Sequence, residues 1–94
     1  MATRFRIYTG DKSPALTDLD NVQLERLVSR TFTDYNLSRA TGYWLGTREL
    51  TMVIEHISET TRREAVYKLA EQIKRFLHQD AVLVTCEQVD LTVI

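Results

Sequence analysis

Hydrophobic and polar residues alternate at the start of the chain. Phe5 and Ile7 alternate with Arg4, Arg6 and Tyr8, a period of two that is typical of a half-buried strand. Turn-forming residues, including the only proline, follow this segment and end it. The pattern predicts a first strand with its apolar side chains on one face and two arginines and a tyrosine on the other.

Two later segments carry apolar residues at intervals of three and four, the period of a helix that is buried on one side. The first extends from about residue 18 to residue 32, and the second from residue 61 to residue 77. Thr61 and Glu64 have the spacing of a capping box, in which each side chain satisfies the free backbone N–H of the other residue. The pattern therefore predicts two amphipathic helices.

Strand-like runs fill the remaining positions. Residues 37–45 and 50–57 are joined by Gly46-Thr47-Arg48, which predicts a hairpin. The second run is apolar at nearly every position, so we expect a central strand that is covered on both faces. Residues 81–86 form a last β-branched run, and its apolar phase changes by one residue near Glu87. That change predicts a bulge or a turn.

The element order is strand, helix, strand, strand, helix, strand. It predicts a single α+β domain over residues 1–94, a ferredoxin-like βαββαβ sandwich with two helices on one face of an antiparallel sheet. The other face of the sheet would then be open. An open face of this kind is often covered by another subunit, so we expect a homo-oligomer.

Composition excludes several classes of protein. The 94 residues carry a net charge of −1, which gives no general reason to expect nucleic-acid binding. No apolar run approaches the roughly 18–20 residues that span a bilayer, and no signal-peptide pattern is visible. A single cysteine excludes an internal disulfide. We therefore expect a cytoplasmic protein without a membrane partner.

No familiar catalytic or metal-binding pattern is present. Cys86 lies in a valine-rich strand and is expected to be a small buried side chain rather than a nucleophile. His56 is expected in the core or at an interface, and His78 at a helix end, with no ligand spacing that indicates a metal. The three glycines do not form a phosphate-binding loop. We therefore expect no enzymatic activity and no cofactor.

The hairpin holds the most informative cluster of side chains. A planar aromatic ring can stack on a base, and arginine can bind phosphate or carboxylate through two N–H groups. These residue types together predict a site for a small anionic, nucleotide-like ligand. The site would comprise Arg39, Tyr43, Trp44, Arg48 and Glu49. The alternative is a hairpin whose aromatic side chains only pack against the two sides of the sheet.

A second anion site is conceivable at the start of the second helix, where Arg62 and Arg63 precede free backbone N–H groups. The basic residues further along this helix alternate with Glu64 and Glu71. Pairs of opposite charge four residues apart explain that pattern as a solvated helix face.

The stretch Gly42-Tyr43-Trp44-Leu45-Gly46, followed by Arg48-Glu49 and an apolar strand, resembles small ferredoxin-like proteins of phages and bacteria. The resemblance covers roughly residues 35–90, with Gly-Tyr-Trp-x-Gly-x-x-Glu as its distinctive part. It implies the fold and no established activity. A phage protein of this kind could sequester a nucleotide signal in the host cytoplasm and so act against host defence. The alternative function is a protein-interaction module, an inhibitor or adaptor that acts through the open sheet face.

Overall fold

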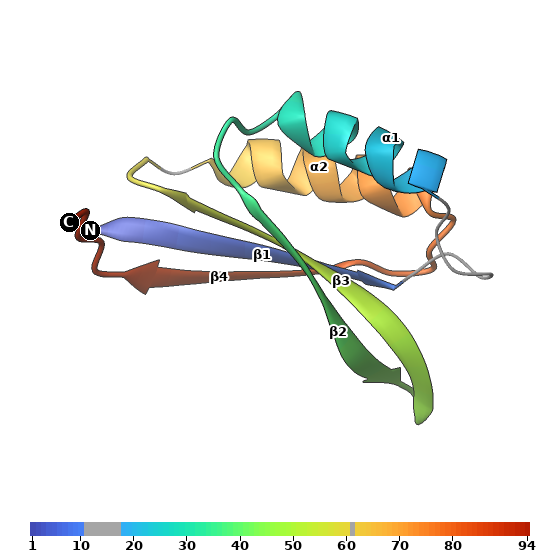
Figure 1. Ribbon diagram of the computed structural model, residues 1–94. Helices are drawn as coiled ribbons and strands as arrows, with labels where there is room; N and C mark the ends of the chain where they lie inside the picture. The colour runs from blue at the N-terminus through green and yellow to red at the C-terminus, as the bar shows by residue number, and fades with distance from the viewer. Residues whose placement is uncertain (11–17, 61) are drawn as a thin grey trace.

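The computed structural model describes residues 1–10, 18–60 and 62–94, and it confirms the predicted order of elements. Four strands and two helices form one α+β, ferredoxin-like unit (Figure 1). The elements are β1 (Ala2–Gly10), α1 (Asp18–Ser29), β2 (Asn36–Trp44), β3 (Thr47–Ser58), α2 (Arg63–Phe76) and β4 (Leu83–Val89).

The four strands form one antiparallel sheet in the order β2-β3-β1-β4. Both helices lie side by side on one face, and the other face carries no helix (Figure 1). None of the described helices is long and apolar enough to cross a membrane. β3 is central, as predicted, but Thr51, Val53 and Glu55 on its open side are only partly buried. The expectation that β3 is covered on both faces is therefore wrong.

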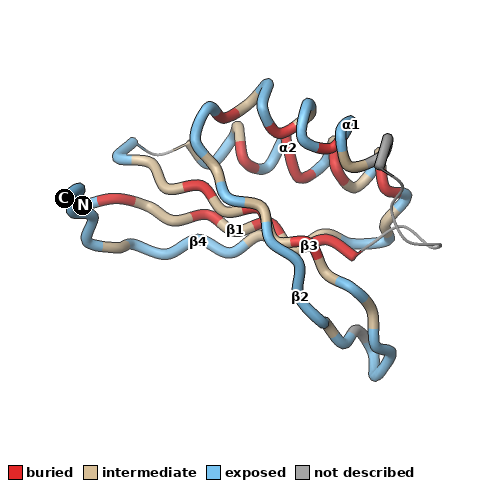
Figure 2. Tube along the Cα trace, viewed as in Figure 1, coloured by how far each residue is buried: buried red, intermediate tan, exposed pale blue. Residues whose placement is uncertain are grey.

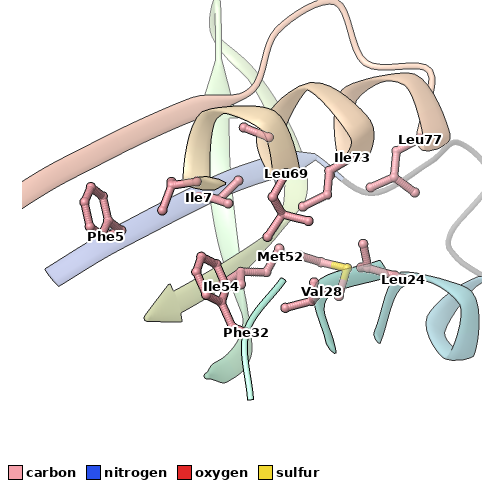
Figure 3. Packing of buried hydrophobic residues seen from close by; sticks show 12 residues of the cluster. Phe5, Ile7, Leu24, Val28, Phe32, Met52, Ile54, Leu69, Ile73 and Leu77 are labelled. Atoms are coloured by element: carbon pink, nitrogen blue, oxygen red, sulfur yellow. The ribbon is translucent and has the colours of Figure 1, made fainter. Parts of the chain in front are cut away.

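The hydrophobic core lies between the helices and the inner face of the sheet (Figures 2 and 3). Phe5 and Ile7 of β1 are buried there, so the alternation predicted for the first strand is confirmed. α2 contributes Val66, Leu69 and Ile73, which recur at intervals of three and four. Burying side chains of this size contributes about 1.5–3 kcal/mol each. The buried face of α2 therefore contributes substantially to the stability of the core.

His56 is a buried core residue, which is one of the two positions predicted for it. Its ring is stacked on Phe32 at 3.8 Å between centroids, and its Nδ1 lies 2.7 Å from the backbone oxygen of Asp34. Arg62 places its guanidinium 5.1 Å from the centre of the same Phe32 ring. These contacts tie β3, the α1–β2 loop and the start of α2 together.

The hairpin turn lies earlier than predicted and is shorter. Leu45 and Gly46 alone connect the strands, with φ of +50° and +81°, and β3 already begins at Thr47. Two positive φ angles are typical of the two-residue turn whose twist matches that of the flanking strands. A leucine in this conformation is unusual, because its side chain crowds the backbone.

Two further boundaries differ from the prediction. β4 pairs with β1 in continuous register through Val89, so no bulge occurs at Glu87. The change of apolar phase places Val89 opposite the buried Ala2 without any break in the strand. At the start of α2 the N-cap position is Arg62, whose side chain makes no capping bond. The predicted capping box depends on Thr61, which lies outside the described residues.

The His56 contacts yield a stability prediction. His56→Ala removes the stacked ring and the bond to the Asp34 carbonyl, and we expect it to lower the free energy of unfolding by about 2–4 kcal/mol. His78→Asn is the control, because His78 is exposed and has φ +52°, a conformation that asparagine tolerates. Urea denaturation of both variants measures the difference. Equal stability of the two variants would contradict a core role for His56.

Candidate functional site

A cavity of about 370 Å³ lies where the end of β1, the β2–β3 hairpin and the α2–β4 connection meet. β1 ends at Gly10, whereas β2 and β3 continue and bend away from the helices (Figure 1). The lining residues are Tyr8, Thr9, Gly10, Ala40, Thr41, Gly42, Tyr43, Glu49, Thr51, Val53, Gln79, Asp80, Ala81 and Leu83. The cavity has the size of a small-molecule site.

Gly10 brings two polar side chains together in this cavity. A Cβ at position 10 would lie 2.8 Å from Gln79 Oε1 and 2.9 Å from Glu49 Oε2. Both distances are shorter than normal contacts of a Cβ atom. The glycine therefore lets an amide and a carboxylate from distant parts of the chain approach the same point of the backbone.

The charge of the cavity is negative. Glu49 and Asp80 are the only charged residues among the described residues that line it. Tyr8 and Tyr43 are also among the lining residues. A carboxylate attracts a cation or accepts a hydrogen bond, and an aromatic face attracts a cation. This lining favours a positively charged ligand, and it does not support the anionic ligand expected from the hairpin arginines.

The described side chains of the predicted site do not all meet in one place. Tyr43 and Glu49 line the cavity, and Glu49 is partly buried. Arg39 lies outside the cavity and donates a hydrogen bond from Nη2 to Asn21 Oδ1 of α1 at 2.9 Å. Arg48 is exposed and lies opposite Tyr43 in the hairpin register. The end of β2 is Trp44, whose side chain is outside the described part of the structure.

Of the lining residues, only Tyr43 and Glu49 belong to the predicted site. Tyr8 was expected on the open face, and no role was predicted for Gln79 and Asp80. No local pattern marks them, because they reach the cavity through the pairing of β1 with β3 and through the path of the α2–β4 connection. The pair Gln79-Asp80, directly before a strand, is a weak signal that polar side chains meet at the end of the sheet.

The rest of the open face is occupied by ion pairs. Arg4 Nε donates to Glu87 Oε1 at 2.8 Å, and Arg6 Nε donates to Glu55 Oε2 at 2.8 Å. The bond from Arg4 holds the pKa of Glu87 below its ordinary value of 4.5. The carboxylate of Glu55 raises the pKa of Arg6. The charges of this face are therefore largely compensated within the sheet.

Cys86 is exposed on the edge strand β4, so the expectation of a buried thiol is wrong. It lies opposite Phe5 in the register, but at the edge no element covers it, and its Sγ lies 3.7 Å from Arg63 Nη2. β1 separates it from His56 on β3. Within the described ranges, no three His, Cys, Asp or Glu side chains are placed to hold a metal ion together.

The fold and the cavity define a small ferredoxin-like protein with an acidic pocket. No protein-family model and no curated protein matches the chain. Among solved structures, a phage SAM lyase in the apo state is similar, with a TM-score of 0.70 and 23% identity over 90% of this chain and 78% of the lyase chain.

Two divalent cation tolerance proteins are less similar. CutA from Archaeoglobus fulgidus has a TM-score of 0.53 and 12% identity over 99% of this chain and 88% of its own. The protein from Thermus thermophilus has a TM-score of 0.52 and 14% identity over 98% and 87%. At these identities the similarities establish the fold.

The lyase corrects one prediction. We expected no enzymatic activity because the sequence contains no recognisable catalytic pattern, but the similar structure with a TM-score of 0.70 is that of an enzyme. The expectation of no enzymatic activity is wrong because the absence of a recognisable motif does not exclude an active site. A lyase site can consist of a few polar side chains that distant segments bring into one pocket, and no local motif then marks it.

The Arg4–Glu87 pair yields a pH prediction. Because the pKa of Glu87 is lower in the folded protein, its ion pair stabilises the fold above the ordinary pKa of 4.5 and stops doing so as the pH falls through the lowered value. We expect Glu87→Gln to be less stable than the unmodified protein at pH 7. The difference should shrink steadily below about pH 4.5.

Urea denaturation between pH 7 and pH 2.5 measures this difference. The control is Glu71→Gln, which changes an exposed carboxyl on α2. A difference between the unmodified protein and Glu87→Gln that stays constant down to pH 2.5 would show that the ion pair is not its source.

Proposed function

We propose that this protein is an enzyme that binds a small, positively charged ligand in the acidic cavity, and that the ligand is S-adenosylmethionine. The observation that carries the proposal is the lining of the cavity, in which Glu49 and Asp80 are accompanied by two tyrosines and by no described basic residue. S-adenosylmethionine is a sulfonium cation with an aromatic base, so its charge and shape complement that lining.

The similarity to the phage SAM lyase supports the same ligand, since the fold alignment covers 90% of this chain. It also supports a phage origin, as does the resemblance of the hairpin to ferredoxin-like phage proteins. A phage protein that consumes a nucleoside in the host cytoplasm would counter a defence that depends on that nucleoside. In this proposal the protein acts against host defence by cleaving the nucleoside, whereas the sequence analysis expected it to sequester a nucleotide signal.

Glu49 is the residue best placed to act on the ligand. In an elimination without water, a base removes a proton from the carbon next to the one bonded to sulfur, a C=C bond forms, and the C–S bond breaks with its electron pair on sulfur, which leaves as a neutral thioether. A carboxylate can neutralise the positive charge of the bound substrate and accept a proton that the reaction releases. Glu49 lies against Gly10, within the cavity and partly shielded from water, where its attraction for a positively charged ligand is stronger than at the surface.

Two neighbouring substitutions distinguish this proposal from the anionic ligand predicted from the sequence. Glu49→Gln keeps the shape of the side chain and removes its charge, so we expect the cleavage of S-adenosylmethionine to fall by at least about 100-fold. Arg48→Ala should change cleavage by less than about threefold, because Arg48 is exposed and lies outside the cavity.

Chromatographic detection of the thioether product measures both rates. Calorimetric titration with S-adenosylmethionine separates a loss of binding from a loss of turnover. Unchanged cleavage in Glu49→Gln would sink the assignment of Glu49. Loss of binding in Arg48→Ala alone would favour the anionic site of the hairpin instead.

We also propose that copies of the chain associate through the hairpin. Its exposed apolar side chains are Tyr43, Leu45 and Leu50, with 70%, 92% and 39% of their surfaces accessible. Leu45 adopts positive φ at the tip, where a polar residue would fit with less strain. The open sheet face is a poorer interface for a partner protein, because its arginines are already paired with Glu55 and Glu87.

Leu45→Asn tests the association. Asparagine tolerates positive φ and removes the apolar side chain, so the hairpin should keep its turn while the oligomer dissociates to a 10.9 kDa monomer. Val22→Gln removes an exposed apolar side chain from α1 and should leave the oligomer intact. Native mass spectrometry reports the mass of each. An oligomer that survives Leu45→Asn at the same protein concentration would exclude the hairpin tip as the interface.

A further inference from the structure

The outer surfaces of the two helices, which face away from the sheet, meet in a groove. α1 and α2 lie side by side in Figure 1, and two hollows of about 380 Å³ and about 360 Å³ follow the line between them. Both hollows share Leu27, Arg30 and Gln72, so they are parts of one continuous groove. We refer to it as the helix groove. It lies on the opposite side of the domain from the open sheet face.

The charge of the helix groove is positive. Arg26, Arg30, Arg62 and Lys68 line it, and no acidic residue is among the described residues that line either hollow. The nearest acid along α1 is Glu25, which lines an adjoining hollow that shares Arg26 and Arg30 with the helix groove. Four cations therefore gather on one side of a protein whose net charge is −1.

The cations of the groove are arranged rather than scattered. Arg26 and Arg30 are one helical turn apart, about 6 Å between their Cβ atoms. Arg62 is half-buried, and its Nη2 donates to the backbone oxygen of Thr31 at 3.3 Å. Its guanidinium lies 5.1 Å from the centre of the Phe32 ring. Because these contacts hold Arg62 in place, less side-chain entropy is lost when it binds an anion.

We propose that the helix groove is a second binding site, for a small polyphosphate ligand such as a nucleoside triphosphate. Arginine forms paired hydrogen bonds with phosphate, and the four cations match the charge of a triphosphate. From Gln23 to Arg30 the groove extends about 10 Å at the rise of an α-helix. Leu27 and Ala65 supply an apolar floor, and the ring of Phe76 at one end offers a surface for a base.

A small ligand fits the groove better than a nucleic-acid chain does. The groove is a hollow of small-molecule size, and the remainder of the protein carries an excess of acidic residues that would repel a long polyanion. The site is independent of the acidic cavity, since the two share no residue.

Calorimetric titration with sodium tripolyphosphate and with ATP, each in metal-free buffer, tests the proposal. We expect both to bind, and Arg30→Ala to weaken each by at least about tenfold, because Arg30 lines both hollows. Arg26→Glu should weaken binding further. Arg75→Ala is the matched control, because Arg75 is an exposed arginine of α2 outside both hollows. Thermal melts verify that each variant is folded.

Each of three results would overturn the proposal. The first is that neither probe binds at about 1 mM, and the second is that Arg30→Ala and Arg75→Ala weaken binding equally. The third is that a single-stranded oligonucleotide binds although tripolyphosphate does not. Glu49→Gln should leave the titrations unchanged. The experiments therefore distinguish a failure of the helix-groove proposal from a failure of the proposal for the acidic cavity.

Discussion

The apolar stripe of α2 packs on β1, and both faces of the sheet follow from that contact. β1 is a central strand, so its period of two assigns Phe5 and Ile7 to the core and Arg4 and Arg6 to the open face. A shift of one residue in register would bury two arginines beneath the helices, at a cost that no rearrangement of the surface could offset. The helix contact therefore determines where the ion pairs of the open face form.

The acidic cavity depends on a difference in strand length. β1 ends at Gly10, while the twisted β2–β3 hairpin continues, and the α2–β4 connection crosses the space left beside it. A side chain at position 10 would occupy the point at which Glu49 and Gln79 converge.

The order of elements, the fold class and the buried face of β1 could be predicted from the sequence, because each depends on periodicity within one segment. The cavity could not, because Tyr8, Glu49 and Asp80 are brought together by pairing between segments far apart in the chain.

Of the predicted hairpin site, Glu49 and Tyr43 line the cavity, whereas Arg39 reaches back to α1. Residue types alone suggested one anion site, but the strand register pairs Tyr43 with Arg48 and Gly42 with Glu49, so Arg48 and Glu49 lie on opposite faces of the hairpin. Cys86 shows the same limit: a valine-rich neighbourhood indicates burial only where another element covers the strand.

A net charge of −1 conceals a separation of charge across the domain. Negative side chains line the cavity at the end of the sheet, positive side chains line the helix groove, and Arg4 and Arg6 of the open face are paired with acids. A ligand at either place would experience the local field, because at physiological ionic strength charges more than about 8 Å away are largely screened. The overall balance of charge therefore argues against long polyanions, but not against a phosphate in the groove or a sulfonium in the cavity. A protein of this size can accommodate both because its two layers place a sheet end and a helix pair on different sides of one core.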